Sequence, residues 1–220
     1  GRNRSPVIRL YSYWRSSSSY RVRIALELKR VAYELVPVHL VRNGGEQRQD
    51  AYRSMNPQQY VPLLEDGATR ISQSLAIIDY LEALAPDPAL LPEQPANRAA
   101  VLSFAQTIAS DIQPLQNLSV LQYLTDELGH APAMRQQWSA HWIDRGLQSL
   151  ESQLAACAPF TCCFSDEPGL ADVCLVPQMY NAERFGVDLE RMPRLVRITR
   201  HLRALPAFQR AHPDHQPDAE

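Results

Sequence analysis

Hydrophobic and polar positions change their spacing several times along the first part of the chain. Residues 7–11 predict a short strand, and from residue 20 to residue 29 the apolar positions recur at helical intervals. Residues 33–38 predict a second strand and residues 46–54 a second helix. The chain therefore begins as a β-α-β-α series.

Two short extended runs, residues 63–65 and 69–71, follow this series. They are joined through Asp66-Gly67, and Asp-Gly between extended runs is typical of a β-hairpin. An amphipathic helix then begins at Gln73. The complete order, β-α-β-α-β-β-α, predicts a thioredoxin-like α/β domain over residues 7–85.

The rest of the chain has a different pattern. Residues 86–95 hold four prolines, which cannot continue a helix, so this stretch is expected to be a semi-rigid linker. Beyond it the apolar positions keep helical spacing in four segments, residues 97–128, 132–156, 170–184 and 191–204. The pattern is interrupted by Pro114, Pro132, Pro177 and Pro193. We predict an all-helical second domain over residues 96–211, with a loosely held polar tail from His212.

Composition and charge exclude several functions. The chain has 220 residues, 45% hydrophobic and 21% charged, as expected of a globular protein with one large domain or two small ones. Its net charge of −2 argues against nucleic acid as a partner, since such proteins usually carry a basic excess. No apolar run approaches the roughly 18 residues of a membrane span. Residues 1–6 are polar and basic and do not resemble a secretory signal.

The four cysteines predict reduced thiols in a cytoplasmic protein. They are Cys157, Cys162, Cys163 and Cys174, and none forms a C-x-x-C pair or has a histidine at zinc-ligand spacing. We therefore expect neither disulfides nor a metal site.

The segment that joins the first strand to the first helix carries the densest candidate chemistry. It contains a run of four serines, Ser16 to Ser19, and serine hydroxyls commonly cap the free amides of a helix start. The same helix end attracts anions, and Arg15, Arg21 and Arg23 lie close to it in sequence. The residues alone leave both interpretations open, a helix cap and an anion site.

Residues 16–26, Ser-Ser-x-Ser-x-Arg-Val-Arg-Ile-Ala-Leu, resemble the signature of zeta-class glutathione transferases, the maleylacetoacetate isomerase family. The resemblance continues through Asn56-Pro57, Tyr60-Val61-Pro62 and Gln73-Ser74, and it resumes at residues 112–121 and 181–185. It covers about residues 8–217. It implies a glutathione transferase fold, glutathione as cofactor, a cytoplasmic homodimer and a small-molecule substrate.

The resemblance also implies a set of glutathione contacts. Val61-Pro62 is expected to be a cis peptide whose Val61 backbone meets the cysteinyl part of glutathione, and Ser74 is expected to hold the γ-glutamyl carboxylate. Ser16 and Ser17 match the active-site serines, and we favour Ser16 as the one beside the sulfur. The full set is Ser16, Ser17, Ser18, Gln47, Val61, Pro62, Gln73, Ser74, Gln113, Asn117, Leu118 and Ser119.

The implied reaction converts maleylacetoacetate to fumarylacetoacetate by reversible addition of a thiolate, in aromatic amino-acid catabolism. Arg184 resembles the residue that binds a carboxylate of the maleyl dicarboxylate substrate, and Arg15 and Arg21 are weaker candidates that could equally be surface arginines. Two alternatives remain open: the shorter substrate maleylpyruvate, and a glutathione-binding module without turnover.

Two positions depart from the family pattern. Ser18 stands where family members usually have cysteine, which we expect to alter substrate preference without abolishing activity, because glutathione supplies the nucleophile. Gly169 begins a Gly-x-x-Asp sequence in place of a Thr-x-x-Asp capping box. The missing hydroxyl is expected to cost a few tenths of a kcal/mol.

Overall fold

The computed structural model describes residues 6–220, so the prediction made for the polar start of the chain lies almost wholly outside the described residues. The chain divides into two compact units. The first consists of the residues up to Pro88 together with Pro206–Glu220, and the second is Ala89–Leu205. Each unit has its own fold.

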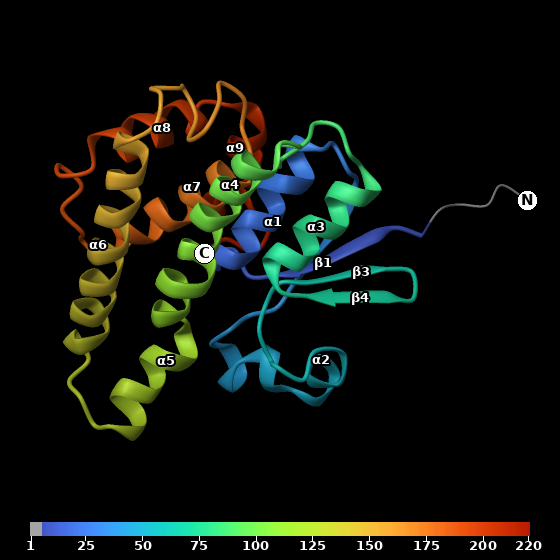
Figure 1. Cartoon of the computed structure of the whole chain (residues 1–220). Helices are drawn as coiled ribbons and strands as arrows, with labels where there is room; N and C mark the ends of the chain where they lie inside the picture. Colours follow the sequence, from blue (N-terminus) through green and yellow to red (C-terminus); the bar gives the residue numbers. More distant parts are fainter. Residues whose placement is uncertain (1–5) are drawn as a thin grey trace, which may run out of the picture. The chain divides into compact units, whose positions relative to one another are not determined.

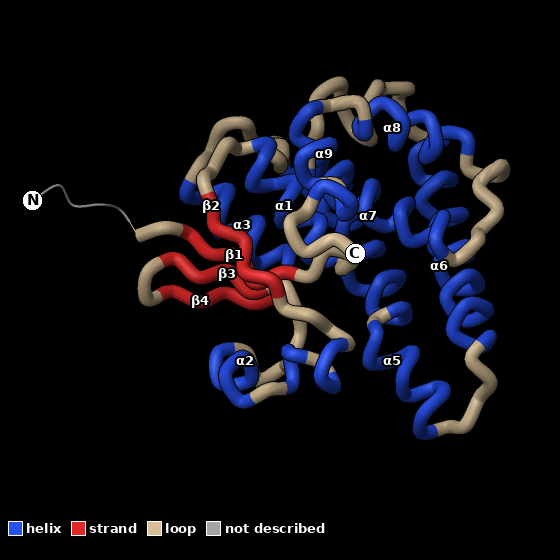
Figure 2. The backbone as a smooth tube through the Cα atoms, turned by 180° about the vertical axis from the view of Figure 1, so that it is seen from behind, coloured by secondary structure: helices blue, strands red, loops and turns tan. Residues whose placement is uncertain are grey.

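The first unit is built on a four-stranded sheet in the order β2-β1-β3-β4 (Figure 2). β1 (Ile8–Ser12) pairs in parallel with β2 (Tyr33–Pro37) and antiparallel with β3 (Leu63–Asp66). β3 and β4 (Thr69–Ser72) form the predicted hairpin, whose turn contains Gly67 at a φ of +58°. The predicted strands and the thioredoxin-like order are confirmed.

Helices cover both faces of this sheet. α1 (Ser17–Leu28) and α3 (Ser74–Leu84) pack together on one side, and α2 (Asp50–Met55) lies on the other (Figures 1 and 2). The helix predicted over residues 46–54 is broken, because Gln49 is extended between a 3₁₀ turn and α2.

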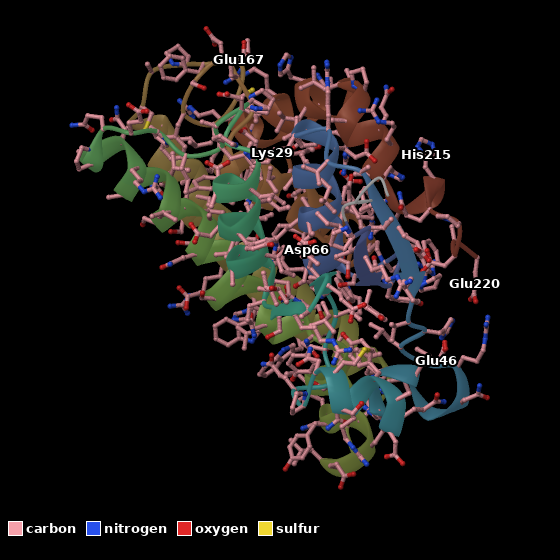
Figure 3. The ribbon with its side chains drawn as sticks, turned by 90° about the vertical axis from the view of Figure 1, so that its right-hand side faces the viewer. Lys29, Glu46, Asp66, Glu167, His215 and Glu220 are labelled. Atoms are coloured by element: carbon pink, nitrogen blue, oxygen red, sulfur yellow. The ribbon has the colours of Figure 1, made fainter. Side chains whose placement is uncertain are left out.

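The end of the chain belongs to the first unit, in contrast to the predicted helical domain over residues 96–211. α9 (Pro206–Ala211) packs on α1. The tail beyond it, predicted to be loosely held, instead forms specific bonds. Glu220, labelled in Figure 3, accepts from His39 Nε2 at 3.1 Å and from Arg42 Nη2 at 2.7 Å. The prediction was wrong because polarity in this segment reflects hydrogen bonding within the unit and not a lack of contacts.

The second unit is helical, and its residues 89–205 contain no strand. Its helices are α4 (Pro95–Gln106), α5 (Leu118–Gln122), α6 (Ala133–Ala155), α7 (Leu170–Arg184) and α8 (Pro193–Arg203). α7 packs against both α4 and α8, and every side chain from its start to Met179 is buried. α7 is therefore the core helix of this unit.

The helical segment predicted over residues 97–128, with its interruption at Pro114, consists of several pieces. After α4 come a π-helical segment, Thr107–Ile112, and a 3₁₀ turn, Gln113–Gln116, before α5 begins. Pro114 has no N–H to donate, so a regular helix cannot run through this point. Gly146 of α6 lies close to the end of the π-helical segment, since a Cβ at Gly146 would stand only 2.3 Å from Ile112 Cδ1. Among residues 6–220, no helix is both long and apolar enough to cross a membrane.

The start of α7 explains the departure at Gly169. The Asp172 carboxylate accepts from the Gly169 and Cys163 backbone amides, each at 2.9 Å, so the acidic half of the capping box is present. Leu170 N donates to Leu90 O at 2.8 Å, and a Cβ at Gly169 would lie 3.1 Å from the same oxygen. Glycine therefore lets the loop around Leu90 approach the helix start closely.

Candidate active site

Ser16 is the N-cap of α1. Its Oγ accepts from Ser19 N at 3.1 Å, so the helix-cap interpretation is confirmed. A hydroxyl also has a proton to donate, and capping uses its acceptor side alone. Ser17, the first residue of α1, is buried, and the first turn holds no acidic residue. Capping and anion binding are therefore compatible at this helix start.

The loop that carries Ser16 is held by Arg23. This buried guanidinium donates to Ser12 Oγ at 3.2 Å, to Trp14 O at 3.1 Å and to Ala211 O at 3.0 Å. Arg23 was predicted to lie near an anion site together with Arg15 and Arg21. The structure instead gives Arg23 a bracing role between this loop and α9. Arg23 is surrounded in the sequence by apolar residues of α1, and this position could have indicated that its side chain is buried.

The tail of the chain holds the same loop. The Trp14 backbone amide donates to Asp218 Oδ2 at 3.1 Å. The exposed side chain of Arg15 lies over the Trp14 ring, 4.3 Å from its centroid. No sequence pattern indicated a contact across two hundred residues, because it depends on the return of the chain to the first unit.

Arg21 lies in the interior, between α1 and the start of α3. Its side chain is buried, and Nη1 donates to Ser74 Oγ at 3.0 Å and to Ser18 Oγ at 3.4 Å. The structure thus brings three of the predicted site residues, Ser18, Arg21 and Ser74, into one hydrogen-bonded group.

Ser74 opens α3. Gln73 precedes it with a φ of +73° and makes no side-chain cap; its Nε2 donates to Gln58 Oε1 at 2.9 Å instead. The first amides of a helix that its N-cap side chain leaves uncapped attract carboxylates and other anions. This geometry agrees with the predicted role of Ser74.

Val61-Pro62 is a cis peptide, as predicted. The carbonyl of Tyr60, just before it, accepts from both the Tyr52 hydroxyl and Asn56 Nδ2. Burial raises the pKa of Tyr52 to about 12, so this hydroxyl stays a donor at physiological pH. The two donors fix the backbone that leads into Val61.

Val61 also belongs to a hydrophobic cluster that links three loops. The cluster consists of Val38, Tyr52, Val61 and Leu63, with Tyr11, Tyr13, Leu40 and Met55 packed against it. Tyr13 comes from the loop that carries Ser16, and the Leu40 carbonyl accepts from Gln47 Nε2 at 3.2 Å. The cluster therefore ties the backbone at Val61 to the segments that bear Ser16 and Gln47.

The predicted residues of the second unit form local contacts. Asn117 caps α5, its Oδ1 accepting from Ser119 N at 2.9 Å and from Ser119 Oγ at 2.7 Å. Leu118 and Gln113 are half-buried. Asn117 and Ser119 thus lie on the polar face at the start of α5.

Arg184 ends α7 and is exposed. Its Nη1 donates to Asn181 Oδ1 at 3.3 Å, and the guanidinium lies 5.5 Å from the centre of the Phe185 ring. Glu183 Oε1 accepts a hydrogen bond from Arg203 Nη1 at 2.7 Å. The carboxylate next to Arg184 in sequence is thus engaged by another arginine.

The residues 6–220 indicate neither a disulfide nor a metal site. All four cysteines are free thiols, and no group of three or more histidine, cysteine, aspartate and glutamate side chains could hold a metal ion. Burial raises the pKa of Cys162 to about 12, which keeps its thiol protonated and unreactive.

Comparison with known proteins identifies the family. Residues 10–89 match the model of the glutathione S-transferase N-terminal domain. The chain is 51% identical over 210 residues to a probable maleylacetoacetate isomerase of Vibrio cholerae, covering 96% of this chain and 97% of the relative. It is 50% identical to the maleylacetoacetate isomerase of Pseudomonas aeruginosa, over 96% of this chain and 98% of the relative. The chain belongs to the maleylacetoacetate isomerase family of zeta-class glutathione transferases.

Solved structures of the zeta-class family agree in fold. A bacterial zeta-class maleyl pyruvate isomerase superimposes with a TM-score of 0.93 at 42% identity, covering 96% of this chain and 100% of that one. The maleylacetoacetate isomerase of Anaeromyxobacter dehalogenans, solved with glutathione in its active site, has a TM-score of 0.87 at 44% identity, covering 99% of this chain and 100% of that one. The expected glutathione transferase fold is confirmed.

As a zeta-class protein the chain should hold glutathione, and one buried atom tests whether the residues fit. Gln47 Oε1 is buried, and no described residue donates to it. A buried acceptor of this kind needs a donor, which an amide or amino group of a peptide ligand supplies. Gly45 makes room for the side chain, since a Cβ there would lie 2.7 Å from the same oxygen. Together with the uncapped start of α3, this acceptor fits a small anionic peptide.

Proposed function

We propose that this zeta-class protein is a glutathione-dependent cis–trans isomerase that converts maleylacetoacetate to fumarylacetoacetate. The observation that carries the proposal is the arrangement within the first unit. A helix-capping Ser16, a cis Val61-Pro62 and a Ser74 at the start of α3 are held there by one connected set of hydrogen bonds and packing contacts. The full-length similarity to named isomerases supports the same reaction.

The first unit supplies the groups that would hold glutathione. The Ser74 hydroxyl and the first amides of α3 would bind its γ-glutamyl carboxylate, and the Val61 backbone would bind its cysteinyl part. Gln47 Oε1 would accept from one of its N–H groups. When bound, glutathione supplies a thiolate that adds reversibly to the cis double bond of the substrate.

Ser16 is proposed to favour the ionised sulfur. Its hydroxyl can donate toward a negative charge at the positive end of α1, and Ser17 lies beside it. Lowering a thiol pKa by about two units needs roughly 2.7 kcal/mol. One hydrogen bond to a charged group contributes about 1.5–3 kcal/mol, and a helix terminus adds about 0.3–1 kcal/mol. The two effects together are large enough.

Arg184 is proposed to bind a carboxylate of the substrate. Its exposed guanidinium is held by a neutral amide at 3.3 Å, and a planar fork suits a carboxylate better than an ammonium does. Arg15 is a weaker candidate, being exposed and stacked on Trp14. Gln113, Asn117, Leu118 and Ser119 are proposed as further glutathione contacts.

Maleylpyruvate is the second candidate substrate, because a structural relative at a TM-score of 0.93 is named for it. We also propose that the protein works in the cytoplasm as a homodimer in aromatic amino-acid catabolism. The free thiols support a reducing compartment, and sedimentation at micromolar concentration would test the dimer.

A steady-state assay tests the function. The purified chain is mixed with maleylacetoacetate or maleylpyruvate and glutathione at one hundredth of the substrate concentration. We expect complete isomerisation of one substrate with glutathione recovered unchanged. Consumption of glutathione would indicate a transferase, and binding without turnover would indicate a glutathione-binding module. No binding by calorimetry at millimolar glutathione would refute the proposal.

A further inference from the structure

The hydrogen-bonded group of Ser18, Arg21 and Ser74 joins two helices. Ser18 and Arg21 are three residues apart on α1 and therefore share one face of that helix. Ser74 is the first residue of α3, which packs against α1. One atom, Arg21 Nη1, reaches both hydroxyls, at 3.4 Å and 3.0 Å.

The direction of these bonds determines what Ser74 can do. Arginine can donate but not accept, so the Ser74 oxygen is the acceptor and its own proton points elsewhere. A hydroxyl that accepts from a cation becomes a stronger donor, because hydrogen bonds in a chain polarise one another. Arg21 thus leaves Ser74 oriented to donate to an anion at the start of α3.

The location of Arg21 also points to an anion. A helix start carries partial positive charge and disfavours a buried cation beside it. Arg21 is 2% exposed and lies next to the first residue of α3. A carboxylate bound at this helix start would interact favourably with both the helix and the guanidinium.

We propose that Ser18 and Arg21 are a positioning pair that orients the Ser74 hydroxyl toward the carboxylate of bound glutathione. This inference rests on the proposed function. It moves Arg21 from the maleyl substrate, where sequence analysis placed it, to the cofactor. It also gives Ser18 a role of its own, as the acceptor that helps to aim the guanidinium. A sulfur in place of the Ser18 oxygen would be a weaker acceptor and would hold the guanidinium less firmly.

A double-mutant cycle read by calorimetry tests the pair. Ser74→Ala and Arg21→Met should each weaken glutathione binding by about 10-fold, the scale of one charge-assisted hydrogen bond. If Arg21 acts through Ser74, the loss of affinity in the double variant should be clearly smaller than the product of the two single losses, and any loss beyond that of Ser74→Ala reports the direct attraction between the guanidinium and the carboxylate. Arg21→Lys should recover part of the affinity, because it keeps the charge and loses the fork.

Ser18 provides a milder variant in case Arg21→Met does not fold. Ser18→Ala should weaken glutathione binding about 2–5-fold in the wild-type background and leave it unchanged in the Ser74→Ala background. Arg30→Met is the matched control, since it removes the same charge from an exposed position just past α1, and its affinity should stay within about twofold.

The outcomes separate the two proposals. A wild-type chain that does not bind glutathione overturns the proposed function. A wild-type chain that binds, with Arg21 and Ser74 effects that simply multiply, overturns the positioning pair alone. A lower melting temperature with unchanged affinity for Arg21→Lys and Ser18→Ala would show that the group merely ties α1 to α3, and would also overturn the inference.

Discussion

Lys29 is the one lysine in the sequence, and we predict that it is a major source of stability in the first unit. Its side chain is fully buried, at 0% exposure. Lys29 is labelled in Figure 3. Nζ lies 2.6 Å from Glu82 Oε1, 2.7 Å from Ala85 O and 2.8 Å from Pro88 O. The last two oxygens follow the end of α3, so one ammonium fastens the end of α1 to the end of α3.

The magnitude follows from these three bonds. Removing one partner of a buried ion pair costs about 3–5 kcal/mol when the remaining charge is fully buried. Here Glu82 is 17% exposed and can regain some water, which lowers the cost. Methionine would keep most of the aliphatic packing. We therefore expect Lys29→Met to lower the free energy of unfolding by about 2–4 kcal/mol, and the melting temperature by about 4–16 °C.

The assay is thermal and urea unfolding of Lys29→Met, Lys29→Arg and Glu82→Gln beside the wild type. Lys29→Arg should also destabilise, because three converging oxygens suit a compact ammonium and not a planar fork. Glu82→Gln should also destabilise, because it leaves the fully buried ammonium without its counter-charge even though the amide keeps an acceptor. A melting temperature within about 2 °C of wild type for Lys29→Met would refute the reasoning.

The single lysine allows a second, independent measurement. An amine-reactive ester can modify the native chain at Lys29 and at the N-terminal amine alone, because no other lysine is present. Acylation of Lys29 should be slow in the folded protein and become fast in urea, since the buried amine is reached through opening of the unit. Fast acylation of the native protein would contradict the burial of this residue.

Two further predictions concern the site, and a third concerns two cysteines of the second unit. Ser16→Ala should lower turnover about 10²–10³-fold and, through loss of the helix cap, stability by about 1 kcal/mol; unchanged turnover would assign the role to Ser17 or to the backbone. Arg184→Ala should raise the substrate KM about 10–100-fold with little change in glutathione affinity, and Arg184→Lys should recover part of it; a fall in melting temperature with constant KM would leave it a helix-end residue. Iodoacetamide at pH 8 should modify half-buried Cys157 well before Cys162, whose pKa burial raises from 9.0 to about 12. The Cys162 thiol loses its proton near pH 9 in the unfolded chain but only near pH 12 in the folded one, so the stability that Cys162 contributes should decline as pH rises from about 9 to about 12. Equal alkylation rates for Cys157 and Cys162 would contradict the burial of Cys162.

Local sequence patterns determined most of the architecture. The alternation of strand and helix spacing before residue 85 predicts the thioredoxin-like order, and Asp66-Gly67 marks the hairpin that the structure contains. The segment of helical spacing over residues 170–184 has the same bounds as α7, although α7 continues through Pro177, where an interruption was predicted. These elements depend on short-range periodicity and turn chemistry, which act between near neighbours in the chain and are therefore legible in sequence.

Long-range hydrogen bonds decided what the candidate site residues do. Three arginines look alike in the sequence, yet Arg15 lies over the Trp14 ring, Arg21 donates to Ser74 and Arg23 braces the loop before α1. The distant partners Ser74 of Arg21 and Ala211 of Arg23 come from helices far away in the chain. Which acceptor each guanidinium meets is therefore decided only when packing brings those elements together.

The end of the chain shows the same limit. A polar segment after residue 212 predicts a loose tail, because its composition offers little apolar surface to bury. The structure instead returns it to the first unit, where Asp218 accepts from Trp14 N and Glu220 accepts from Arg42. Sequence determined which elements form and which residues could bind glutathione. Tertiary structure decided which polar groups meet, because a hydrogen bond depends on distance in space and not on separation along the chain.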